Sequence, residues 1–347
     1  MRIGDIYAER SERGAEDMEL LSVTMNDGVK MRSYIEGKDN SSEDKSNYKI
    51  VRAGDMVYNS MRMWQGANGI SPWDGIVSPA YTVLKPRMPI SNGFFAALFK
   101  THRLINEFRK NSQGMTSDTW NLKYPQIETI KTCIPALAEQ EKIADFLMAL
   151  DQRIEKQRTL VEHLKKYKRG VSDKIFSEAD RWDQVAFLDV FSTVSDKPYQ
   201  VTTSEYYDSG AYEVVDQGKN DIVGYNDDES KVFYAIPIIV YGDHTTIIKY
   251  RNVPFIVGGD GVKLLTTKTN NDLQYLYYAL CQYNIQPEGY KRHFSIVKHL
   301  DIPIPSIEKQ RLIAETLATL DIKIQKESCL LDKLLTKKKA FLQQLFM

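Results

Sequence analysis

Glycines, carboxylates and lysines occur in two arrangements that approach the spacing of catalytic motifs. The run from Gly258 to Lys263 is rich in glycine, but a phosphate-binding loop requires Gly-x4-Gly-Lys-Ser/Thr, and here Lys263 precedes Leu264. Asp243 followed by Asp260 and Lys263 approaches the Asp…Asp/Glu-x-Lys pattern of metal-dependent nucleases, but two residues separate Asp260 from Lys263. We therefore expect neither nucleotide hydrolysis nor DNA cleavage, and no catalytic residues, in this chain.

The histidines and cysteines also lack the spacing of a metal site. His293 and His299 lie six positions apart and have no cysteine partner, which argues against zinc. Cys133, Cys281 and Cys329 are odd in number and widely spaced, which excludes a disulfide framework and a Cys-x-x-Cys site. We expect no metal-binding or cofactor-binding residues, and unpaired cysteines indicate a reducing compartment such as the cytoplasm.

Length and composition describe a folded chain of about two domains. The 347 residues are 42% hydrophobic and 27% charged, which is typical of globular proteins. Lys and Arg number 46, as do Asp and Glu, so the chain is not basic overall, although a local basic face remains compatible with this balance. No apolar run reaches 18 residues and the first residues lack the apolar segment of a secretion signal. We expect no membrane association.

An internal repeat at an offset of 170 residues is the most informative feature of the chain. Residues 134–176 align with residues 304–346 without a gap, and 14 of the 43 positions are identical. In the first copy the identical residues are Ile134, Pro135, Gln140, Ile143, Ala144, Leu147, Leu150, Asp151, Ile154, Lys156, Leu160, Leu164, Lys168 and Phe176. The regions that precede the two copies have diverged from each other, so the chain alternates variable and shared segments.

The shared segment has the periodicity of a long helix. Pro135 and Pro305 mark its start, and apolar residues then recur at spacings of four and three over more than four heptads, which is typical of a coiled coil. Gln157 aligns with Glu327, and Lys168 with Lys338, as polar interruptions that could set the register of a pair formed by the two copies. The predicted seam residues are Ile143, Leu147, Leu150, Ile154, Gln157, Val161, Leu164, Ile313, Leu317, Leu320, Ile324, Glu327, Leu331 and Leu334.

The regions outside the repeat predict an α+β fold with a pseudo-twofold axis. Residues 1–133 and 181–303 contain short apolar runs between turn signals, such as 50–58 and 76–85, which favour strand-rich globular domains. Helical stretches are expected at 94–110 and 273–283. The shared helices occupy residues 134–180 and 304–347, and we expect them to pair as an antiparallel coiled coil.

The repeated segment resembles the conserved helical segment of type I restriction–modification specificity subunits. The resemblance rests on Ile-Pro-x4-Gln-x2-Ile-Ala-x2-Leu-x2-Leu-Asp-x2-Ile from Ile134, and on its second copy from Ile304. In the second variable region, Val257-Gly-Gly-Asp-Gly261 and the Tyr-rich run 275–280 are similar to one class of the family's target-recognition domains. Gly54-Asp-Met-Val-Tyr-Asn59 in the first region resembles another class.

Membership of that family implies a subunit that does no chemistry itself. Two target-recognition domains each read half of a bipartite sequence in double-stranded DNA, and the paired helices set the gap between half-sites, as a rigid spacer would. The helices also dock two modification methyltransferase subunits, and a restriction–translocation subunit can join them. S-adenosylmethionine, ATP and Mg²⁺ are then expected on the partners only, since this chain lacks the Asn-Pro-Pro-aromatic tetrapeptide of such methyltransferases. The resemblance also implies a bacterial or archaeal host.

Candidate DNA contacts are the polar, basic and aromatic residues of loops between apolar runs. Arg pairs with guanine, Asn or Gln with adenine, and Lys more often contacts phosphate. In residues 1–133 the candidates are Asn59, Ser60, Arg62, Trp64, Gln65, Asn68, Thr116, Ser117 and Lys123. In residues 181–303 they are Gln217, Lys219, Asn220, Tyr225, Tyr241, His244, Lys249, Lys263, Lys291 and Arg292. A packed loop or a solvated surface explains the same residues without DNA.

Two alternatives remain open from the sequence. The region 181–305 has 11 basic and 16 acidic residues, which fits a coiled-coil scaffold, or an inactive copy of a specificity subunit, that does not read DNA. The other alternative is an enzyme whose nuclease or methyltransferase motif is unrecognisable in one variable region. Dependence of DNA binding on sequence would exclude the scaffold, and activity of the isolated chain with a metal or S-adenosylmethionine would indicate the enzyme.

Overall fold

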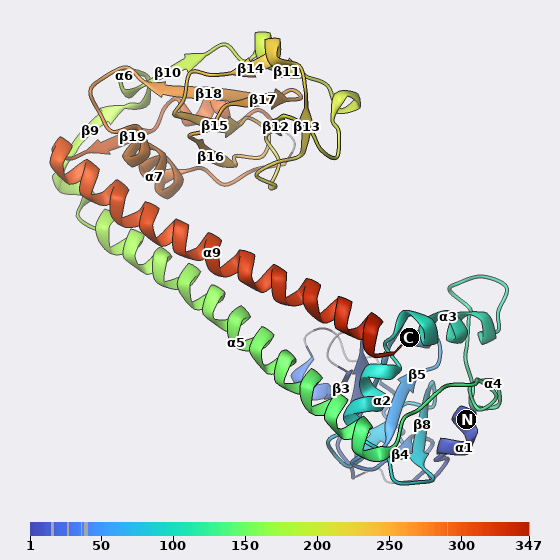
Figure 1. Ribbon diagram of the computed structural model, residues 1–347. Helices are drawn as coiled ribbons and strands as arrows, with labels where there is room; N and C mark the ends of the chain where they lie inside the picture. Colours follow the sequence, from blue (N-terminus) through green and yellow to red (C-terminus); the bar gives the residue numbers. More distant parts are fainter. Residues whose placement is uncertain (15–16, 26–27, 36, 38–40, 290, 347) are drawn as a thin grey trace. The chain divides into compact units, whose positions relative to one another are not determined.

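The chain forms two compact units that share two long helices. The computed structural model describes residues 1–14, 17–25, 28–35, 37, 41–289 and 291–346. One unit comprises Met1–Arg158 and Cys329–Met347, and the other comprises Thr159–Ser328. The helices α5 (Leu137–Phe176) and α9 (Ile307–Leu345), labelled in Figure 1, are each divided between the two units, after Arg158 and after Ser328. The predicted α+β class, with two strand-rich parts and two long helices, is confirmed.

The first unit is built on an antiparallel sheet of strand order β1-β8-β5-β6. Its strands are β1 (Tyr7–Glu9), β8 (Tyr81–Pro86), β5 (Met56–Asn59) and β6 (Asn68–Ile70). Side chains alternate across the sheet as in any strand, so Met56 and Tyr58 face helices α2 (Asn92–Leu98) and α3 (His102–Asn111), whereas Val57 faces the other way. Two ribbons cover that second face: β2 (Leu21–Thr24) with β3 (Gly28–Met31), and β4 (Lys49–Val51) with β7 (Gly75–Val77).

The second unit repeats this topology and adds a sheet. Its first sheet has the order β10-β18-β15-β16, with β10 (Phe191–Val194), β18 (Val262–Thr267), β15 (Ile238–Gly242) and β16 (Ile248–Arg251). Ile239 and Tyr241 face helix α7 (Leu273–Tyr283), and Ile238 and Val240 face the second sheet. That sheet contains β11 (Gln200–Val201), β17 (Phe255–Gly258), β12 (Tyr212–Val215), β13 (Gly224–Asn226) and β14 (Val232–Phe233).

Short elements complete the two units at equivalent places. Helix α1 (Ile3–Ile6) precedes β1, and α6 (Phe187–Val190) precedes β10; α4 (Tyr124–Ile127) and α8 (Phe294–Val297) precede the long helices. Strand β19 (Asp301–Ile304) pairs with β9 (Asp183–Ala186) in the second unit, where Asp301 lies opposite Ala186. In the first unit Lys131 lies opposite Arg2. The 3-10 turns are η1 (Arg32–Tyr34), η2 (Met63–Gln65), η3 (Ala179–Arg181), η4 (Lys197–Tyr199), η5 (Thr203–Glu205) and η6 (Glu229–Lys231).

Local turn chemistry divides two of the segments that the sequence predicts as continuous. The run 50–58 forms two strands, β4 and β5, because Gly54 adopts φ = 93° between them, a conformation that glycine tolerates. The stretch 94–110 forms two helices because the Thr101 side chain caps α3 by accepting a hydrogen bond from the Leu104 N–H. The helix expected at 273–283 is found there as α7.

The long helices run antiparallel to each other within each unit. In the second unit Lys168, late in α5, places Nζ 2.5 Å from Oδ1 of Asp321, early in α9. In the first unit the repeat-equivalent pair, Lys338 and Asp151, has the same 2.5 Å separation. All fourteen predicted seam residues are buried or half-buried in their own units. The antiparallel pairing of the long helices and the internal repeat are therefore confirmed. In each unit the lysine of one repeat pairs with the aspartate of the other.

A phenylalanine at the end of α5, and another directly after the end of α9, each enter the core of a unit. Phe346 is 9% exposed and lies 5.2 Å from the ring of Phe94 in the first unit. Phe176, its repeat equivalent, is 6% exposed and lies 6.3 Å from the ring of Tyr275 in the second unit. Burial of aromatic rings of this size dominates core energetics, so these residues attach the helix ends firmly. No helix in the described part of the chain combines the length and apolar character needed to cross a membrane.

Candidate nucleic-acid interface

The same two loops meet in both units, at the end of the equivalent strands β5 and β15. In the first unit the loop between β5 and β6 contacts the loop before α4, where Leu122 donates its N–H to the carbonyl of Ser60 at 2.8 Å. In the second unit the loop between β15 and β16 contacts the loop before α8, where His293 donates its N–H to the carbonyl of Asp243 at 2.7 Å. Loops held on a rigid sheet in this way commonly carry binding residues.

In the first unit these loops bring basic and aromatic side chains together. The rings of Trp64 and Trp120 meet edge to face at 5.2 Å, and the Arg109 guanidinium lies 5.5 Å from the Trp120 ring. Trp64 is fixed by a 3.1 Å hydrogen bond from Nε1 to the carbonyl of Met61. Arg62 is exposed, and its guanidinium has no ion-pair partner among the described residues. An exposed guanidinium beside an aromatic ring, as Arg109 has, and a second exposed guanidinium, that of Arg62, suit a surface that contacts DNA bases and phosphates.

Most of the predicted first-unit candidates are accessible to solvent in the structure. Arg62, Thr116, Ser117 and Lys123 are exposed, and Asn59, Trp64 and Gln65 are half-buried. Trp120, which contacts Trp64, and Arg109, which contacts Trp120, are further candidates that the sequence analysis did not name. Trp120 could have been found because it follows the polar run 116–119, whereas Arg109 reaches the surface only through the tertiary position of α3.

Two first-unit candidates are corrected because their side chains are buried. Asn68 is 0% exposed and its Nδ2 donates to the carbonyls of Gly66 and Phe99, so the amide holds η2 against α2. Ser60 is 6% exposed and its Oγ lies 2.8 Å from Oγ1 of Thr82. Neither side chain can reach a base in this fold.

In the second unit a hydrogen-bond network joins four loops. The Gln217 side chain accepts the N–H of His244 at 3.0 Å and donates to the carbonyl of Asp260 at 2.9 Å. His244 Nδ1 lies 3.3 Å from the carbonyl of Lys291, which ties the loop before α8 to the same place. Lys219, Asn220, Lys291 and Arg292 are exposed around this network, and Gln217, Tyr225, His244 and Lys263 are half-buried.

Two second-unit candidates are also corrected. Lys249 is 6% exposed, and its Nζ donates to the carbonyls of Asp216 and Asn220, so the ammonium organises the loop instead of facing solvent. Burial lowers the pKa of Lys249 because the charged form loses hydration, and Asp216 partly offsets this. Tyr241 is 0% exposed and packs 5.7 Å from the ring of Phe294, and burial raises the pKa of its hydroxyl.

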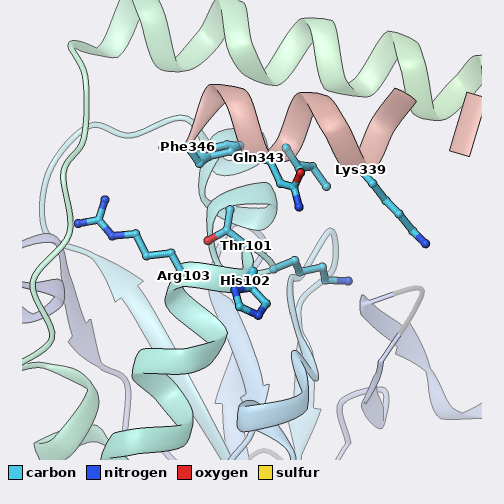
Figure 2. A pocket seen from close by; sticks show the side chains of 8 residues that line it. Thr101, His102, Arg103, Lys339, Gln343 and Phe346 are labelled. Atoms are coloured by element: carbon cyan, nitrogen blue, oxygen red, sulfur yellow. The ribbon is translucent and has the colours of Figure 1, made fainter. Parts of the chain in front are cut away.

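A separate basic pocket of about 490 Å³ lies within the first unit, where the α2–α3 junction meets the end of α9. Figure 2 shows Thr101, His102 and Arg103 on one side and Lys339, Gln343 and Phe346 on the other. The residues that line the pocket include no Asp or Glu, so it lacks a carboxylate that could act with His102 in general acid–base catalysis. None of the predicted DNA contacts lines it. Among the described residues, no three His, Cys, Asp or Glu side chains cluster to hold a metal ion.

Comparison with known proteins decides the family. The sequence signature of the type I restriction modification DNA specificity domain matches residues 24–164 and, a second time, residues 179–335. The chain belongs to this family. Each copy of the specificity domain covers strands of one globular part together with much of the long helix that follows it.

Individual specificity subunits are similar over different lengths. The EcoR124I/EcoR124II specificity subunit of Escherichia coli is 30% identical over 86 residues, which span 24% of this chain and 21% of that protein. The MjaVIII specificity subunit of Methanocaldococcus jannaschii is 23% identical over 334 residues, covering 78% of this chain and 73% of that one. The crystal structure of the type I S subunit from M. genitalium shares the fold, with a TM-score of 0.65 and 16% identity over 100% of this chain and 95% of the other.

Proposed function

We propose that this specificity-domain protein reads a bipartite target in double-stranded DNA, one half-site with each unit. The supporting observation is that the two domain copies present the same pair of loops at the same sheet end, yet with different side chains. Equivalent surfaces with different residues suit two half-sites of different sequence. In the first unit Arg62 would contact a base, Lys123 and Arg109 would contact phosphate, and Trp64 with Trp120 would pack against the groove.

In this proposal the long helices separate the two readers and recruit the enzymes. We infer that two modification methyltransferase subunits dock on the chain and that a restriction–translocation subunit joins them in the cytoplasm. The chemistry, with S-adenosylmethionine, ATP and Mg²⁺, would belong to those partners. Partner subunits would also supply phosphate contacts, because the region 181–305 is acidic and phosphate contacts dominate affinity.

Methylation mapping tests this function directly. The chain is expressed together with the modification methyltransferase encoded beside it, and modified adenines are read across the host genome. We expect a bipartite motif with a fixed gap that is absent when this chain is omitted. A stable complex that creates no new motif would instead support the scaffold or an inactive copy.

Replacement of Arg62 tests the reading of one half-site. We expect Arg62→Ala to relax specificity at one base pair of a single half-site, with a loss of about 1–3 kcal/mol if the guanidinium pairs with a base. Binding of the mutant complex to duplexes with every substitution in both half-sites measures this. Lys142→Ala, an exposed lysine on α5 in the same unit, is the matched control. Uniform weakening on all duplexes would mean that Arg62 contacts phosphate, and no loss would remove it from the interface.

A further inference from the structure

The repeated glutamine at the start of each long helix makes the same contacts in both units. Gln140 is the fourth residue of α5 and is only 2% exposed. Its Nε2 donates to the carbonyl of Pro135 at 2.9 Å, and its Oε1 accepts the N–H of Ser91 at 3.1 Å. Ser91 caps α2, the helix that packs on the sheet of the first unit. One side chain therefore connects the turn into α5 with the start of α2.

Gln310 repeats this arrangement in the second unit. It is the fourth residue of α9 and is also 2% exposed. Its Nε2 donates to the carbonyl of Pro305 at 2.9 Å, and its Oε1 accepts the N–H of Asp272, the residue that caps α7, at 2.9 Å. A further bond from Nε2 to Oδ1 of Asn271, at 2.8 Å, occurs in this unit. We call each set of contacts the glutamine clamp.

The contacts that the two clamps share are made to backbone groups, a carbonyl and an N–H, so they do not depend on which side chains the variable regions carry. The capping residues differ, Ser91 in one unit and Asp272 in the other. Each nevertheless donates its backbone N–H to Oε1 of the repeated glutamine. The nitrogen and the oxygen of each buried glutamine amide both have hydrogen-bond partners. Rotation of the globular part about the start of the helix would break these bonds and leave buried polar groups without partners.

Close packing one turn further along the helix limits the same motion. A Cβ added to Gly93 in α2 would lie 2.9 Å from Cβ of Ala144 in α5, so these helices are in direct contact. Ala314, the repeat equivalent of Ala144, is 3% exposed in the core of the second unit. The small repeated alanine and the glutamine clamp thus lie on the same side of the helix start, towards the globular part.

We propose that Gln140 and Gln310 are positioning residues that fix the orientation of each recognition domain on the helix that follows it, and thereby restrict the gap between half-sites that the complex accepts. This inference rests on the proposed function. The glutamines contact no DNA in this scheme. They act through α2 and α7, whose orientation determines where the loops that carry the candidate contacts point.

Volume-matched variants separate positioning from simple stabilisation. Gln140→Met and Gln310→Met fill similar space but remove the two hydrogen bonds of Gln140 and the three of Gln310. Ser91→Ala and Asp272→Ala remove the side-chain caps of α2 and α7 but leave the backbone N–H that the glutamine accepts, so they weaken the same helices without opening the clamp. Glu141 and Arg311 follow the two glutamines in the sequence and are exposed. Glu141→Met and Arg311→Met therefore control for the introduction of a methionine.

The complex with the modification subunits is assayed on duplexes that keep both half-sites and vary the gap by one base pair either way. The quantity measured is the methylation rate at an altered gap divided by the rate at the original gap. For Gln140→Met and Gln310→Met we expect this ratio to rise about fivefold to tenfold, because the loss of one net hydrogen bond is worth a change of that size. Base preference within the half-sites should stay unchanged. The Ser91→Ala, Asp272→Ala and methionine controls should keep the original gap preference.

Two results would overturn the positioning role. One is a uniform fall in methylation with unchanged gap preference in Gln140→Met and Gln310→Met. The other is the same change of gap preference in Ser91→Ala and Asp272→Ala, since that would reflect loss of stability. Amide exchange at residues 91–94 and 272–275 in the same complexes gives a readout without DNA: faster exchange in the glutamine variants supports the clamp, and unchanged exchange contradicts it. A wild-type complex that creates no bipartite motif would reject the proposed function separately.

Discussion

Seven residues inserted into both α5 and α9 are expected to lengthen the gap of the DNA target while both half-site sequences stay the same. Insertion between Arg158 and Thr159, and between Ser328 and Cys329, uses repeat-equivalent positions where one compact unit ends and the other begins. One heptad preserves the apolar seam and adds about 10 Å of helix at 1.5 Å per residue. Since B-DNA rises about 3.4 Å per base pair, the gap should grow by about three base pairs.

DNA twist sets a limit on the activity of this variant. Three additional base pairs rotate one half-site by about 100° relative to the other, because B-DNA turns once in about 10.5 base pairs. A heptad rotates the helix by only about −20°, so the best new target should be methylated more slowly than the original. Genome-wide mapping of modified adenines measures both gap and rate. Altered half-site bases, or an unchanged gap in a stable complex, would contradict a spacer role for the helices.

The same insertion in α5 alone provides the matched control. The two ion pairs, Lys168 with Asp321 and Lys338 with Asp151, lie on opposite sides of the insertion point in the sequence. A heptad in one helix only prevents both pairs from keeping their register at once. We expect this variant to lose thermal stability and to yield little methylation, in contrast to the paired insertion.

Replacement of Phe346 or Phe176 by alanine is expected to give the largest losses of stability. Truncation of a buried phenylalanine typically costs about 3–5 kcal/mol, through lost transfer free energy and the cavity that remains. Phe176 contacts three aromatic rings, those of Trp182, Tyr275 and Tyr283, whereas Phe346 contacts the ring of Phe94. Phe176→Ala should therefore lie at the upper end of that range and Phe346→Ala below it.

The two phenylalanine variants should also act on different parts of the chain. Hydrogen exchange resolved by segment should show faster opening around α2 for Phe346→Ala and around α7 for Phe176→Ala, because those helices lose the aromatic contact. Leu345→Ala and Leu160→Ala, at residues 37% and 41% exposed, are controls that remove a large side chain from the helices at little cost. Equal destabilisation by all four substitutions would mean that Phe176 and Phe346 contribute no more to stability than the exposed leucines.

Burial of polar side chains was the main feature that the sequence concealed. Asn68 and Lys249 look like exposed loop residues because amides and ammonium groups rarely lie inside a protein. The fold accommodates them by placing backbone carbonyls around each: Gly66 and Phe99 accept from Asn68, and Asp216 and Asn220 accept from Lys249. Apart from Gly66, these acceptors lie about 30 positions away in the sequence, in segments that meet only in the folded domain, so residue type alone could not predict the outcome.

The internal repeat and the heptad period determined the architecture without reference to any structure. Helix formation and pairing along a seam depend on spacings of three, four and seven residues, which are local and therefore readable. The tertiary structure alone decided what several of the identical repeat positions do. Gln140 meets Ser91, Asp151 meets Lys338, and Phe346 meets Phe94, across 49 to 252 positions of sequence. Contacts over such separations depend on how the sheets bring their loops and helices together, and no local pattern carries that information.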